Sequence, residues 1–169
     1  PEKVRKALFP HFMKVLAAQI HTIFYKDQNV LSRTALREFI DLFHFFVTMK
    51  AIEVLKPSSI GYCCKDGLDV SLTSLFDPLI LLKLLHGGHS THREESYIQA
   101  CLFGLPLITR GRTLFDERFE RLKNLIKLFE TTIEEHGLRE FRRLIKAKIE
   151  PLFDPDTLDA SGSVKFPPS

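Results

Sequence analysis

The sequence has no tryptophan, and 15 phenylalanines dominate its aromatic content. The 169-residue chain is 44% hydrophobic and 27% charged, a globular composition that excludes a disordered or collagen-like chain. A chain of this length can bury enough surface to fold without a disulfide or a structural metal. We therefore expect a core of phenylalanine and leucine side chains, and the sequence predicts no cofactor.

Cysteine is also scarce, and its arrangement argues against a disulfide framework. The three cysteines are Cys63, Cys64 and Cys101, an odd number of which two are adjacent. Free thiols are typical of proteins in a reducing compartment. The sequence therefore predicts an intracellular protein, cytoplasmic or nuclear.

Long apolar runs are absent too. The longest candidates, residues 42–47 and 79–85, are far shorter than the ~18 residues that a membrane span needs. The start of the chain has no signal-peptide pattern. Because the chain begins at Pro1 rather than at methionine, we expect it to be a segment of a larger protein.

Neither charge nor motifs indicate an enzyme. The formal net charge is only +3, and nucleic-acid binding would require a concentrated basic stripe rather than a mild excess. The sequence has no Gly-x-Ser-x-Gly elbow and no phosphate-binding P-loop. Its carboxylates lie in mixed-charge segments, so no pair stands out as a general acid and base. We predict a non-catalytic protein.

Helical periodicity runs along most of the chain. The predicted helices are Val4–Tyr25 (kinked or restarted at Pro10), Arg33–Leu55 (capped by Ser32 and stopped at Pro57), a segment from Asp77-Pro78 to Leu85, a segment from Thr91 to about Gly104-Pro106, Leu114–His136, and Leu138–Ile149. They predict an all-α fold, either a single-domain bundle or stacked helical hairpins of about six helices. This domain covers residues 1–150, has an irregular loop at 57–69, and precedes a flexible Pro-, Asp- and Ser-rich tail at 151–169.

The helix predicted at 33–55 has more apolar residues than one face can hold. One face consists of Leu36, Phe39, Ile40, Phe43, Val47 and Val54. A second set lies off that face and consists of Phe45, Phe46, Met49 and Ile52. The second set predicts a groove that accepts an amphipathic helix of a partner protein, and the alternative is ordinary burial under a neighbouring helix.

Cations gather at two places late in the chain. Arg110 and Arg112 precede the helix at 114–136, and the last helix carries Arg139, Arg142, Arg143 and Lys146. Guanidinium groups bind phosphates and carboxylates, so these residues predict a basic patch for an acidic protein, a nucleic acid or an anionic lipid. The alternative is that glutamates between the cations make ordinary solvated helix faces.

A histidine-rich stretch, LLHGGHSTHREE at residues 84–95, is the remaining candidate site. His86, His89 and His92, together with Cys63 and Cys64, are weak candidates for a zinc site or a reactive thiol. However, Gly87 fits the end of one helix, and Thr91 with Glu94 fits the capping box of the next. We therefore predict a helix joint without a metal.

The function predicted from these features is a non-catalytic intracellular protein-interaction domain, which binds its partner through an apolar groove or a basic helix face. One alternative is nucleic-acid or anionic-lipid binding by the basic C-terminal helix. The other is a metal- or cysteine-dependent enzyme that uses the histidine and cysteine loops.

Overall fold

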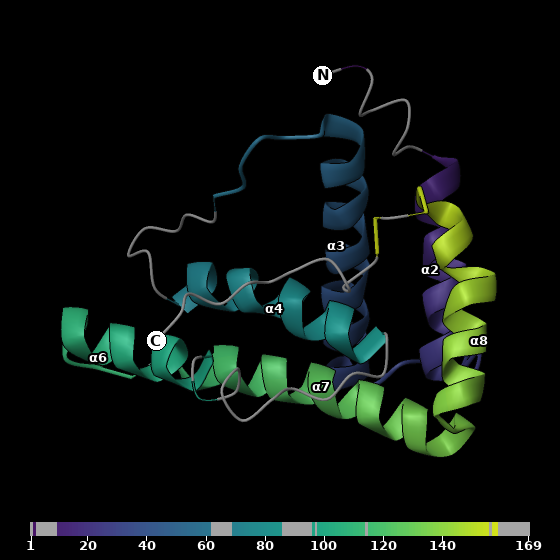
Figure 1. Cartoon of the computed structure of the whole chain (residues 1–169). Helices are drawn as coiled ribbons and strands as arrows, with labels where there is room; N and C mark the ends of the chain where they lie inside the picture. The colour runs from purple at the N-terminus through teal and green to yellow at the C-terminus, as the bar shows by residue number, and fades with distance from the viewer. Residues whose placement is uncertain are drawn as a thin grey trace. The chain divides into compact units, whose positions relative to one another are not determined.

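The computed structural model describes residues 2, 10–61, 69–85, 96, 98–113, 115–155, 157 and 158, and it gives only the backbone of residues 69–72 and 74–76. The helices are α2 (His11–Tyr25), α3 (Arg33–Leu55), α4 (Asp69–Leu85), the π-helix η1 (Ala100–Gly104), α6 (Leu105–Arg110), α7 (Asp116–His136), α8 (Leu138–Lys148) and the 3-10 helix η2 (Glu150–Leu152) (Figure 1). No strand occurs among the described residues. The predicted all-α fold is confirmed.

The chain divides into two compact units. The first unit comprises residues 1–59 and 124–159, and the second comprises residues 60–123 and 160–169. The first therefore contains α2, α3, the C-terminal part of α7, and α8. The second contains α4, η1, α6 and the first turns of α7.

Local signals in the sequence explain where the helices of the first unit begin and end. The Ser32 hydroxyl accepts a hydrogen bond of 3.1 Å from the Ala35 amide and caps the start of α3. α3 ends where Lys56 adopts a left-handed conformation. α2 begins directly after Pro10, which lies at its N-cap. A proline is tolerated there because the first amides of a helix have no intrahelical acceptor.

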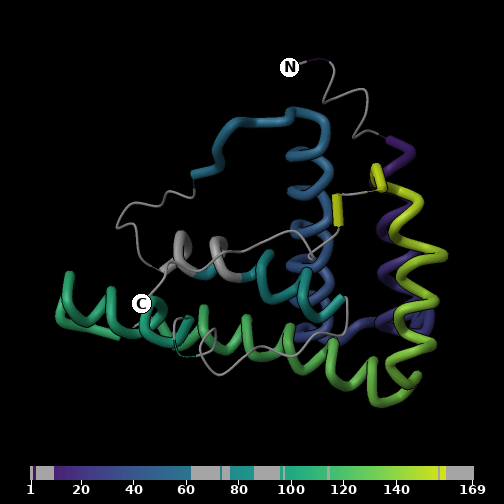
Figure 2. Tube along the Cα trace, in the orientation of Figure 1, coloured from purple at the N-terminus to yellow at the C-terminus, as the bar shows by residue number. Residues whose placement is uncertain are grey.

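Phenylalanines from three helices form the centre of the first unit. The ring of Phe24 on α2 lies 5.0 Å from Phe129 on α7 and 6.2 Å from Phe141 on α8, and Phe129 lies 6.0 Å from Phe141. All three pairs pack edge to face, the arrangement that aromatic quadrupoles favour. Figures 1 and 2 show α2 and α8 side by side, and this triangle joins them to α7.

α3 buries a different face from the one that periodicity suggested. Phe45, Phe46 and Met49 are buried, and Ile52 is half-buried. By contrast, Leu36 on the main predicted stripe is 49% exposed. Apolar spacing identifies the faces of a helix but does not say which face a neighbour covers. Phe45, Phe46 and Met49 are therefore buried under neighbouring elements, which is the alternative to the predicted partner groove. Their burial gives no support to a groove that binds a partner at these residues.

The first part of the predicted tail packs on this unit. Glu53 on α3 accepts hydrogen bonds from the amide of Asp154 at 2.9 Å and the hydroxyl of Thr157 at 3.0 Å. Glu53 also pairs with Lys50, whose ammonium group lies 5.5 Å from the ring centre of Phe153. Phe153 is buried, so the chain is held in place beyond residue 151, where a loosely held tail was expected.

Two prolines lie in helical segments of the second unit. α4 starts at Asp69 and continues through Pro78, so the sequence signal at Asp77-Pro78 marks neither a start nor a break. The next helical segment was predicted to end near Gly104-Pro106, and this is wrong, because helix continues to Arg110. The π turn of η1 comes just before Pro106 and relieves the clash between the proline ring and the preceding turn.

Candidate functional site

The candidate metal and thiol residues lie outside the described part of the chain. These residues are His86, His89, His92, Cys63 and Cys64. Within the described ranges, no group of three or more histidine, cysteine or carboxylate side chains could hold a metal ion. Cys101 in η1 is a half-buried free thiol. A helix joint at residues 84–95 remains a prediction.

The six cations of the predicted basic patch fall on both units. Arg110 ends α6, and Arg112 follows it in the second unit. The other four are Arg139, Arg142, Arg143 and Lys146, all on α8 in the first unit. Each group is a candidate surface of its own unit.

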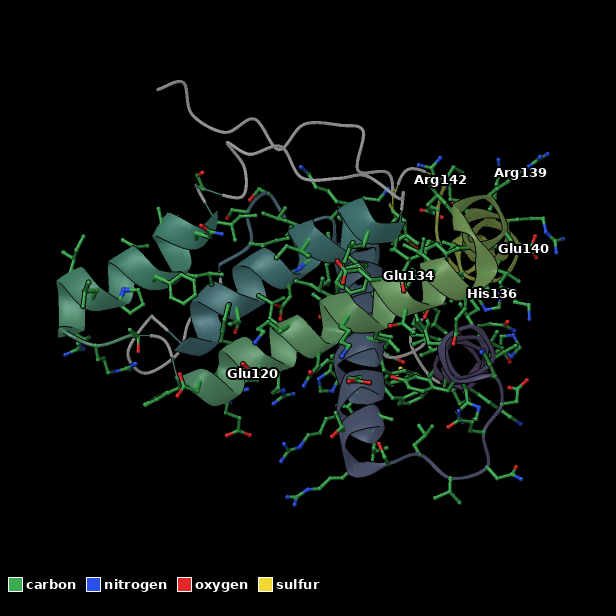
Figure 3. All side chains as sticks on the ribbon, turned by 90° about the horizontal axis from the view of Figure 1, so that it is seen from below. Glu120, Glu134, His136, Arg139, Glu140 and Arg142 are labelled. Carbon is green, nitrogen blue, oxygen red and sulfur yellow. The ribbon has the colours of Figure 1, made fainter. Side chains whose placement is uncertain are left out.

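The four cations of α8 form one line on the helix, which we call the basic stripe. Their spacing of three, four and seven residues places them on one face, opposite the buried Phe141 and Ile145. Figure 3 shows Arg139 and Arg142 pointing away from the ribbon of α8. Together with His136, Gly137 and Glu140, the stripe lines a shallow surface hollow of about 460 Å³.

One carboxylate lies among these cations. Glu140 receives two hydrogen bonds from Arg143, from Nε at 2.7 Å and from Nη2 at 2.6 Å. This two-pronged contact holds the pKa of Glu140 below its usual value and raises the pKa of Arg143. Arg139 and Lys146 have no such carboxylate partner among the described residues. The hollow consequently keeps an excess of positive charge.

A second surface, which the sequence analysis missed, surrounds α6. Of the eleven large apolar side chains that are exposed among the described residues, five lie between residues 103 and 115. They are Phe103, Leu105, Leu107, Ile108 and Phe115, and we call them the α6 projection. Ile108 is 83% exposed and Phe115 is 58% exposed. Pro106 is the one buried residue of α6.

Aromatic contacts hold both ends of the α6 projection. The ring of Phe103 lies 5.1 Å from the ring of Phe119 on α7 in a T-shaped pair. The guanidinium of Arg112 lies 4.2 Å from the ring centre of Phe115, within the range of a cation–π contact. Arg112 also donates a 3.0 Å hydrogen bond to the Thr113 carbonyl. The projection therefore presents apolar side chains on a locally ordered backbone.

The sequence contained one signal for this surface. Residues 101–108 read CLFGLPLI, an almost unbroken apolar run with no helical spacing. A short helix made from such a run is apolar on every side, so packing on one side leaves the others exposed. Gly104-Leu105-Pro106 by itself predicts only a helix end, and this prediction hides the exposed apolar surface.

A buried hydroxyl lies at the end of α2, on Tyr25. Burial, followed by the charges of Glu38 and Asp41, raises the pKa of Tyr25 far above its usual value. Burial and the charge of Asp41 likewise raise the pKa of Glu38. The Tyr25 hydroxyl has no hydrogen-bond partner among the described atoms. Burial therefore disfavours negative charge at this site, and among the described residues no group of three or more histidine, cysteine or carboxylate side chains could hold a metal ion here.

None of the described helices is both long enough and apolar enough to span a membrane. Comparisons with protein-family models, with curated proteins and with solved structures found no match to this chain.

Proposed function

We propose that this chain is a non-catalytic, intracellular protein-interaction domain, and that its α6 projection inserts into an apolar groove of a partner protein. The observation that carries the proposal is the exposure of Ile108 and Phe115 on one short segment. Single exposed apolar residues are ordinary, but a concentration of them marks an interaction site. The compartment follows from the scarce and unfavourably spaced cysteines.

The form of the surface favours a partner with a groove. α6 is short, and Leu105, Leu107 and Ile108 are all exposed, so the segment offers side chains on several sides rather than one flat face. A helix of this kind binds by burying its apolar side chains in a concave site. Arg110 and Arg112 lie between Ile108 and Phe115 in the sequence and favour carboxylates at the rim of that groove.

The test uses a photo-crosslinking amino acid at position 107, with position 127 as control. Lys127 is exposed on α7 and lies outside the α6 projection. We expect the crosslinker at position 107 to capture one distinct protein, and the added substitution Ile108→Ser to abolish the capture. The captured protein, once purified, should then bind the unmodified chain about tenfold or more tightly than Ile108→Ser, as expected for a central apolar anchor.

Three results would contradict this function. The first is equal capture from positions 107 and 127, which would indicate non-specific proximity. The second is undiminished affinity in Ile108→Ser when its thermal unfolding midpoint matches that of the unmodified chain. The third is binding of the chain to anionic lipid vesicles that Ile108→Ser removes, because the α6 projection would then be a membrane contact.

A further inference from the structure

A different surface, in the first unit, carries an inference that does not depend on the α6 projection. We propose that the basic stripe of α8 binds a small anion with two or more phosphate groups. The residues that would contact it are Arg139, Arg142, Arg143 and Lys146, and they line the hollow beside the α7–α8 corner.

The length of the basic stripe indicates how many charged groups its ligand carries. Arg139 and Lys146 are seven residues apart, which is about 10 Å along an α-helix. That span is longer than one phosphate group, so a ligand that uses both ends must carry charges at two points. The hollow is open and about 460 Å³ in volume, which suits a compact polyanion.

The guanidinium groups of the basic stripe favour phosphate as the charged group of the ligand. Three of the four cations are arginines, and a guanidinium donates two parallel hydrogen bonds to the oxygens of one phosphate. Among the described residues, no phenylalanine or tyrosine lines the hollow and His136 supplies its one ring, so the series of stacking platforms that a single-stranded nucleic acid uses is missing there. The apolar face of α8 is buried through Phe141 and Ile145, so this helix has no apolar face to insert into a bilayer.

Glu140 sets how strongly the hollow attracts an anion. Its carboxylate occupies the fork of Arg143 through both of its oxygens. A phosphate that takes the place of this carboxylate must break a charged pair that is already satisfied. Arg139 and Lys146 are the first contacts for an incoming anion, because neither is paired with a carboxylate among the described residues.

The experiment titrates the protein with inorganic tripolyphosphate and follows backbone amide signals by NMR and heat by calorimetry. We expect the signals of residues 136–146 to shift. The variant Arg139→Gln/Lys146→Gln should lower the affinity about tenfold or more, the loss expected for charge-assisted hydrogen bonds. The matched control is Arg33→Gln/Lys127→Gln, which removes one arginine and one lysine of the same unit outside the hollow and should leave the affinity within about twofold.

A second variant tests the role of the carboxylate in the opposite direction. Glu140→Gln removes the charge that occupies Arg143 and should strengthen the binding of tripolyphosphate. Glu140→Gln and Arg139→Gln/Lys146→Gln change exposed or half-exposed side chains, so circular dichroism should show unchanged folding for both.

An experiment with lipid vesicles distinguishes the two possible sources of the phosphates, a lipid headgroup and a soluble anion. Stripe-dependent binding to phosphatidylcholine vesicles that carry a bisphosphorylated inositol lipid assigns the ligand to a headgroup, and binding of tripolyphosphate alone assigns it to a soluble anion. Equal losses in the two double variants would overturn the proposal. So would the absence of tripolyphosphate binding, or tighter stripe-dependent binding of polyglutamate or of duplex DNA.

Discussion

The two units of the chain use apolar side chains in opposite ways. In the first unit, Phe129 and Phe141 are fully buried and pack edge to face with Phe24. In the second, Phe115 is 58% exposed, and its ring centre lies 4.2 Å from the guanidinium of Arg112. The same residue type therefore forms the core of the first unit and lies exposed on the second. Aromatic composition alone does not separate these roles.

The largest expected effect tests this contrast directly. Phe129→Ala removes a fully buried ring from the centre of the first unit and should lower the free energy of unfolding by about 3–5 kcal/mol. Phe115→Ala removes an exposed ring of the same size and should cost less than about 1 kcal/mol, mainly through the lost cation–π contact. Urea unfolding followed by circular dichroism measures both, and similar losses would refute the contrast.

A second prediction compares two glutamate pairs. Glu53 is almost fully buried and holds Lys50, the Asp154 amide and Thr157, so Glu53→Gln should cost about 1–3 kcal/mol of unfolding free energy. Glu120 pairs with Lys123 on an exposed helix surface, and Glu120→Gln should cost less than about 1 kcal/mol. If Glu120→Gln lowered the free energy of unfolding more than Glu53→Gln, the contacts of Glu53 with Asp154 and Thr157 would not stabilise the first unit.

The Glu53 contacts also predict a dependence on pH. Burial by itself would raise the pKa of Glu53, but hydrogen bonds from Lys50, the Asp154 amide and Thr157 lower it below the usual value. A carboxylate with a lowered pKa contributes stability above its unfolded pKa of about 4.3, and the contribution is lost as the pH falls through the folded pKa. The stability difference between the unmodified chain and Glu53→Gln should therefore shrink in acid. A constant difference in urea midpoint from pH 7 to pH 3 would contradict the lowered pKa.

The smallest expected effect has the opposite sign. Glu38 lies on the same helix, and burial together with the charge of Asp41 raises its pKa. A raised pKa means that the charged form costs stability above the unfolded pKa, so neutral Glu38→Gln should raise the thermal midpoint slightly at pH 7. The gain should stay below about 1 kcal/mol, because much of the side chain is solvated. A lower midpoint would show that its charge is favourable.

The sequence predicted the helices better than their environments. The bounds of α3 were predicted correctly because Ser32 and Pro57 are local signals of capping and termination. Burial of Phe45 and Phe46 depends on which elements pack over α3, and no local pattern contains that information. The contact of Glu53 with Thr157 joins residues 104 positions apart, so periodicity could not reveal it.

The sequence also predicted one candidate surface and missed another. Helical spacing was sufficient to place Arg139, Arg142, Arg143 and Lys146 on one face of α8, and the structure has them there. Their pairing with Arg110 and Arg112 in one patch remains a prediction. The α6 projection was missed because a π turn allows helix to continue past Pro106, where a regular α-helix was expected to stop.

That π turn makes η1 a place where the chain can change length by one residue. A π turn contains one residue more than a regular turn, and its residues turn the chain by about the same angle as one residue fewer of an α-helix. Deleting one residue of η1 would therefore restore α-helical spacing and leave Pro106 on the buried side of α6. The same deletion in a regular helix would rotate every later residue by about 100°. The faces of α6 are thus insensitive to a lost codon in η1 and sensitive to one that comes after it.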